Sequence, residues 1–117
     1  MDRAEMERRT KSFALQVVRF VADLPKNKVS DVLGYQLLKA ATSIGANYRE
    51  AGRAESHADF CHKMAIVEKE ASETQYWLEL CKEAPLGDLS KVATLYDEAT
   101  QLLAIVTASN KTAKMRK

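Results

Sequence analysis

The sequence predicts an all-α fold, an up-down-up-down antiparallel four-helix bundle. Apolar or small residues recur at alternating spacings of four and three along four segments, which is the pattern of an amphipathic helix. Polar segments with Pro, Gly and capping residues separate these four stripes. All three connections are short, and short links between long helices place successive helices antiparallel.

The four predicted helices follow one another without any strand pattern. Their inward stripes are Met6, Thr10, Phe13, Val17, Phe20 and Leu24; then Leu33, Leu37, Ala40, Ile44, Asn47 and Ala51; then Phe60, Met64, Val67, Ala71, Thr74, Leu78 and Cys81; and finally Leu89, Val92, Tyr96, Ala99, Leu103 and Val106. Ser30, Ser56 and Asp88 are the predicted N-caps of the second, third and fourth helices, because short polar side chains accept from free backbone N–H groups. Asp59 adds a weak capping box to Ser56.

Length and charge fit one small soluble domain. The chain has 117 residues and a net charge of +2, so its overall charge does not indicate nucleic-acid binding. We expect one domain at residues 1–110 and a basic tail at 111–117 that frays, because the tail lacks an apolar stripe. The charge is segregated: residues 55–83 hold seven acids and three bases, whereas 111–117 hold four bases and no acid.

The cellular context is predicted to be the cytoplasm, and no membrane segment is expected. The first residues are charged where a secretory signal would be apolar, and no apolar run reaches the length of a bilayer. Cys61 and Cys81 lie twenty residues apart in one predicted helix, too far to pair, so both are expected to be reduced.

The segment SIGANYREAGRAES, residues 43–56, holds the most unusual polar residues. Asn47 falls on the inward stripe, so it is predicted to be buried and to bond across to the third helix or to a neighbouring subunit. Gly45 in a helix interior predicts the close approach of another helix. A ligand or nucleic-acid contact through Arg49 and Arg53, one turn apart, is the alternative.

The run LLKAATSIGANYREAGRAESHADFCHKMAIVEKEASETQYWLELCKEA, residues 37–84, resembles the four-helix-bundle proteins related to those encoded in 23S ribosomal RNA intervening sequences. The residues that carry the likeness are Ser43, Ile44, Asn47, Glu50, Ser56, Asp59, Phe60, Glu70 and Glu73. The resemblance implies a homopentamer and a relation to the ring-forming, nucleic-acid-binding accessory proteins of diversity-generating retroelements. We assign Asn47, Glu50, Glu70 and Glu73 to a structural polar network.

Apolar residues outside the inward stripes also favour a ring-like homo-oligomer. They are Leu95, Leu102 and Ile105 on the fourth helix, and Ile66, Tyr76, Trp77 and Leu80 on the third. The alternative is a single bundle with a wide apolar face, since core-facing helices often use three positions in seven.

No enzyme, cofactor or metal site is predicted. The chain lacks the Glu-x-x-His motifs of di-iron bundles, and it has no nucleophile elbow or phosphate-binding loop. His57 with Cys61, and Asp59 with His62, have spacings that could meet at a transition metal, but polar residues are usual at a helix start.

The predicted function is that of a non-enzymatic oligomeric interaction protein that binds RNA or single-stranded nucleic acid weakly. The nucleic-acid-binding residues would be Arg49, Arg53, Lys111, Lys114, Arg116 and Lys117. The alternative is a cytoplasmic scaffold or adaptor that binds a protein partner without nucleic acid.

Overall fold

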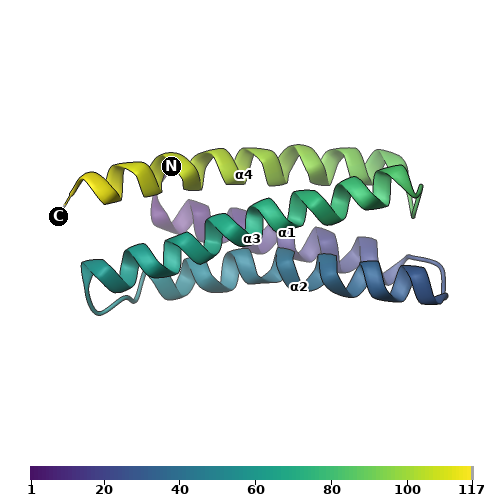
Figure 1. The fold of residues 1–117 in the computed structure, drawn as a ribbon, viewed down its shortest axis with the longest axis horizontal. Coiled ribbons are helices and arrows are strands. Elements are labelled where there is room, and N and C mark those ends of the chain that lie inside the picture. Colours follow the sequence, from purple (N-terminus) through teal and green to yellow (C-terminus); the bar gives the residue numbers. More distant parts are fainter. Residues whose placement is uncertain (117) are drawn as a thin grey trace.

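The computed structural model describes residues 1–116, and in this part of the chain the secondary structure consists of four helices. These are α1 (Arg3–Ala22), α2 (Lys28–Ala51), α3 (His57–Glu83) and α4 (Leu89–Met115). They form an elongated bundle of 48 × 21 × 20 Å in which successive helices run in opposite directions (Figure 1). The predicted four-helix bundle is confirmed, and both termini lie towards the same end of it.

The helices pack unequally around the bundle. Contacts are most extensive between α2 and α3, nearly as extensive between α3 and α4, and sparse between α1 and α4. The close approach predicted at Gly45 is confirmed, because a Cβ atom there would lie 3.2 Å from Thr10 Oγ1 on α1. Small residues in α2 thus let α1 approach its backbone closely.

The inward stripes are largely as predicted, and the clearest shift of register is on α4. All six residues predicted for α1 and its exit are buried. On α4, however, Leu95 and Leu102 are buried, while Tyr96 and Leu103 are half-buried and Leu89 is exposed. Leu95 and Leu102 therefore belong to the core and do not form the extra face that the sequence suggested.

Two of the three predicted N-caps are confirmed. Ser56 and Asp88 cap α3 and α4, and Asp59 N donates to Ser56 Oγ at 3.0 Å. The cap of α2 is Asn27 rather than Ser30, because the Asn27 side chain accepts from Ser30 N at 2.9 Å. Ser30 lies in the first turn of the helix and is buried.

The end of α4 also differs from the prediction. The helix continues through Met115, and Asn110 and Ala113 extend its buried stripe past residue 106. Lys111 and Lys114 therefore lie on an ordered helix, so the fraying expected from residue 111 is wrong for the part of the tail that the structure describes. Lys117 lies outside the described residues.

Candidate functional site

The basic residues singled out from the sequence lie at one end of the bundle. This end, which we call the termini end, comprises residues 1–11, 47–63 and 107–116, where α1 and α3 begin and α2 and α4 finish (Figure 1). These segments contain ten Lys and Arg and six Asp and Glu. The opposite end, which we call the turn end, comprises residues 19–34 and 79–95 and contains five of each. The bundle is therefore electrically polar along its long axis.

The C-terminal part of α4 provides the least balanced charge of the termini end. Residues 99–116 contain Lys111, Lys114 and Arg116 and no acid. All three side chains are exposed. Cations near the last turn of a helix also stabilise its macrodipole, so a purely structural benefit accompanies any binding role.

Arg49 and Arg53 are exposed near the end of α2, and Arg49 lies close to an acid of α1. Arg49 Nε lies 3.7 Å from Glu7 Oε1 on α1, a long and exposed ion pair that contributes little stability. Arg3, which the sequence did not single out, donates from Nη1 to the Gly52 carbonyl oxygen at 2.7 Å. No local sequence signal indicates this contact, because the partners are 49 positions apart.

The predicted polar network is only partly present in the single chain. Asn47 is half-buried rather than buried, and its amide nitrogen donates to the Ser43 carbonyl oxygen of its own helix at 2.9 Å. Glu50 is exposed and has no side-chain hydrogen bond to any other described residue. The expected full burial of Asn47 is therefore wrong for the single chain, whereas its bond to a neighbouring subunit stays a prediction.

Glu70 and Glu73 do lie together on α3, at the edge that faces α2. Burial raises the pKa of Glu70, and the hydrogen-bonded, negatively charged Glu73 raises it further; a hydrogen bond from Ser43 on α2 opposes the shift. In the folded chain Glu70 therefore holds a proton more readily than an exposed carboxylate does.

A second polar cluster, which the sequence did not reveal, joins α3 to α4. Asn110 is buried, and its Nδ2 donates to the Met64 carbonyl oxygen at 3.0 Å and to Glu68 Oε1 at 2.7 Å. Thr107 Oγ1 donates to Glu68 Oε2 at 3.1 Å. The signal was present, because Asn110 continues the spacing of four from Val106, but the polar tail concealed it.

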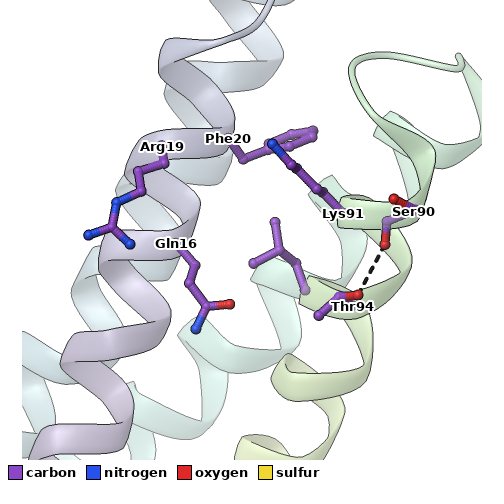
Figure 2. A pocket seen from close by; sticks show the side chains of 7 residues that line it. Gln16, Arg19, Phe20, Ser90, Lys91 and Thr94 are labelled. Carbon is purple, nitrogen blue, oxygen red and sulfur yellow. Dashed lines mark hydrogen bonds between the residues drawn. The ribbon is translucent and has the colours of Figure 1, made fainter.

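The sparse contact between α1 and α4 leaves a hollow of about 260 Å³ towards the turn end (Figure 2). Buried Phe20 and Leu95 line it together with polar Gln16, Ser90, Lys91 and Thr94. Figure 2 shows the Arg19 guanidinium on the side of α1 that faces away from α4. The hollow therefore presents an apolar surface and one cation, that of Lys91. These two features do not indicate which ligand would bind there.

The metal-ligating side-chain types do not gather into a metal site within residues 1–116. No group of three or more His, Cys, Asp or Glu side chains converges there to hold a metal ion. His57 and Cys61 do approach each other, at 3.5 Å between Nε2 and Sγ. None of the helices described by the structure combines the length and apolar character needed to cross a bilayer.

Comparison with known proteins gives a family for this architecture. A crystal structure of a protein of unknown function from the S23 ribosomal protein family of Bacteroides thetaiotaomicron VPI-5482 superimposes with a TM-score of 0.87 at 32% sequence identity. The match covers 95% of this chain and 99% of that one. No protein with a curated description matches. Residues 3–108 match the family described as 23S rRNA-intervening sequence protein, and the chain therefore belongs to this family.

Proposed function

We propose that this chain is a non-enzymatic, cytoplasmic interaction protein that assembles as a homo-oligomer, most simply a pentamer, and binds single-stranded RNA weakly through its termini end. The observation that carries the proposal is the acid-free stretch at residues 99–116, which presents Lys111, Lys114 and Arg116 at the same end as Arg49 and Arg53. Contacts of this kind recognise phosphates and carry no sequence information.

Oligomer formation would raise the affinity for RNA, although each chain would make the same contacts with the RNA as it would alone. Each copy contributes the same cluster of cations, and once one cluster is bound the others act at high effective concentration. The ordered α4 helix favours this arrangement, since it holds Lys111 and Lys114 one turn apart and avoids the entropy cost of fixing a frayed tail.

Salt dependence tests the proposal. Binding of the full chain to a fluorescent single-stranded RNA should weaken linearly on a log-log plot, with a slope of roughly −0.7 for each phosphate engaged. Replacing Lys111, Lys114 and Arg116 with Gln should reduce that slope. The same replacement of Lys26, Lys28 and Lys91 at the turn end is the matched control and should leave it unchanged.

Two outcomes would overturn the RNA proposal. One is the absence of binding at about 50 mM salt, where electrostatic contacts are strong. The other is an equal reduction of the slope by the turn-end control. Substitution is preferable to deletion of residues 111–117, because deletion would also remove the buried side chain of Ala113.

A second candidate, a protein scaffold, is favoured by exposed apolar side chains at the turn end. Val29 and Val32 near the start of α2 are 56% and 51% exposed, and Leu89 at the start of α4 is 48% exposed. Groups of exposed apolar residues are typical of protein contact sites. Light scattering coupled to size exclusion separates the possibilities: a monomer at micromolar concentration removes self-association and leaves a different protein as the partner.

A further inference from the structure

Two hollows at the termini end share the side chain of Phe60. The first, which we call the Tyr48 hollow, has a volume of about 410 Å³ and is lined by Arg3, Tyr48 and Phe60. The second, which we call the His57 hollow, has a volume of about 440 Å³ and is lined by His57, Phe60 and Arg116. Both volumes fall in the range of about 300–1,000 Å³ that is typical of small-molecule sites. Each hollow thus combines two aromatic rings with one arginine.

The aromatic rings of the hollows are held in place by the rest of the bundle. Tyr48 and Phe60 are half-buried and pack against the buried core, and both also line the Tyr48 hollow. His57 is held by α4, because its Nε2 lies 3.1 Å from the Ala113 carbonyl oxygen. Rings that are already ordered lose little conformational entropy when a flat ligand stacks on them.

The guanidinium of Arg3 is positioned by the end of α2. Its Nη1 donates to the Gly52 carbonyl oxygen at 2.7 Å, and a Cβ atom at position 52 would lie 2.8 Å from the same nitrogen. The glycine therefore leaves the space that Arg3 occupies. The other N–H groups of Arg3 have no hydrogen-bond or ion-pair partner among residues 1–116. A guanidinium that is fixed in this way and keeps free donors is well suited to a phosphate.

The charges around the hollows favour an anion at the arginines and a neutral group at Tyr48. Arginines are the charged residues that line the two hollows in the described part of the chain, and no acid lines either hollow there. Burial raises the pKa of Tyr48, Arg3 lowers it, and Glu7 and Asp2 raise it further. Because these two carboxylates repel a phosphate, an uncharged base is the better occupant next to the Tyr48 hydroxyl.

We propose that the two hollows hold unpaired bases of single-stranded RNA, which stack on Tyr48 and Phe60 while Arg3 and Arg116 bind the adjoining phosphates. This inference rests on the RNA binding proposed above and adds a contact of a different kind. Aromatic rings next to cations bind single strands with little sequence preference, because every base has a face that can stack. Stacking releases no counterions, so its contribution is separable from that of the phosphate contacts by salt dependence.

The first test removes the rings and keeps the apolar packing. Tyr48→Leu and Phe60→Leu should each weaken binding of the full chain to a fluorescent single-stranded RNA at least about fivefold, and neither should change the log-log salt slope. Tyr76→Leu, an exposed change on α3, is the matched control and should leave the affinity unchanged. Circular dichroism and light scattering check that each variant keeps the fold and mass of the wild type.

The outcomes separate this inference from the proposed function. If the wild type binds RNA and both leucine variants bind equally well, the stacking is overturned while the phosphate contacts of α4 stand. If the wild type shows no binding at about 50 mM salt, the RNA proposal itself fails, and the stacking with it.

A photocrosslink tests the contact without any variant. A single-stranded RNA that carries 5-iodouridine should crosslink to Tyr48 or Phe60 of the wild-type chain, located by mass spectrometry of the digested protein. An abasic strand of the same length and charge should bind at least about fivefold more weakly than the complete RNA. Equal affinities for the two strands, or crosslinks confined to Tyr35 and Tyr76, would contradict the proposal.

The role of Arg3 is tested through the salt slope. Arg3→Gln keeps a side-chain N–H donor for the Gly52 carbonyl but removes the charge, so the slope should become shallower by about 0.7, the value for one phosphate. Arg19→Gln, an exposed change at the turn end, is the matched control and should leave the slope unchanged. Equal slopes for R3Q and the wild type would remove Arg3 from the site.

Discussion

Helix α3 has acids on two flanks, and the two flanks satisfy them differently. Towards α4, Glu68 accepts hydrogen bonds from Asn110 and Thr107, and Glu79 accepts one from the Tyr96 hydroxyl at 3.2 Å. Towards α2, burial and the neighbouring Glu73 carboxyl raise the pKa of Glu70, and Ser43 on the facing helix opposes the shift. The acids of α3 thus accept stabilising hydrogen bonds at the contact with α4. At the contact with α2, Glu70 and Glu73 are an unfavourable pair when both are charged.

The largest expected effect is at Asn110, the centre of the favourable flank. Asn110→Ala removes two hydrogen bonds and leaves a small cavity, so the free energy of unfolding should fall by about 2 kcal/mol. Urea denaturation measures it. Asn47→Ala on α2 is the matched control, and a loss within about 0.5 kcal/mol is expected because, among the described residues, the Asn47 side chain bonds within its own helix. Equal losses would show that the flanks do not differ.

A smaller loss is expected at Glu68, which accepts from two side chains of α4. Glu68→Ala should lower the free energy of unfolding by about 1 kcal/mol, because it leaves the second donor hydrogen of Asn110 without its acceptor. Ser72→Ala, an exposed change on the same helix, is the control. In an N110A background the cost of E68A should shrink, since the two side chains act together. Strict additivity would contradict the shared bond.

The smallest expected effect is a gain in the free energy of unfolding, and it concerns Glu73 on the flank of α3 that faces α2. Glu73→Gln should raise the free energy of unfolding at pH 7 by about 0.5 kcal/mol, because it removes a like-charge pair three residues apart on a helix. Glu79→Gln, whose wild-type carboxylate has a hydroxyl donor, should give no such gain. A loss of stability in E73Q would show that the pair stabilises the fold.

The same pair predicts how stability changes with pH. The pKa of Glu70 is raised above its ordinary value of 4.5 in the folded chain, so the folded state binds this proton more readily than the unfolded state. Its contribution to stability is therefore fully present below about pH 4.5 and is lost as pH rises through the raised pKa. The advantage of E73Q over the wild type should accordingly be larger at pH 7 than at pH 5, measured by urea denaturation at both values.

The fold followed from the spacing of apolar residues, and the errors arose where that spacing was ambiguous. On α4, Leu95 and Tyr96 are both apolar neighbours, as are Leu102 and Leu103, so hydrophobicity alone does not choose the inward one. The Tyr96 hydroxyl decides the first case, because it reaches Glu79 at the surface while Leu95 fills the core. Likewise, Asn27 and Ser30 both have side chains that can cap a helix. Only the extended backbone at Asn27 shows which of them is the N-cap of α2.

The candidate site was less predictable than the fold. Arg49, Arg53 and the last bases of α4 could be chosen as exposed cations, but their location at one end depends on the antiparallel topology. The contact between His57 and Ala113 joins residues 56 positions apart, and no periodicity indicates it. Asn47 was misplaced because the stripe of α2 turns slightly along the helix: Ala41 and Gly34 are buried, while Leu33 and Asn47 are half-buried.

The uneven packing of α1 has a consequence for how the bundle opens. Towards α4, the side-chain hydrogen bonds described for α1 are those of Arg9, which binds Glu98 twice at 2.7 Å and Gln101 at 2.9 Å. Most of the remaining packing of α1 is against α2. Because the helix with the fewest contacts detaches at the lowest free energy, the amides of α1 should exchange with deuterium before those of α3, which packs extensively on both sides. In the proposed homo-oligomer, a detached α1 would be able to dock on the α2 of a neighbouring copy, which would exchange a terminal helix between subunits.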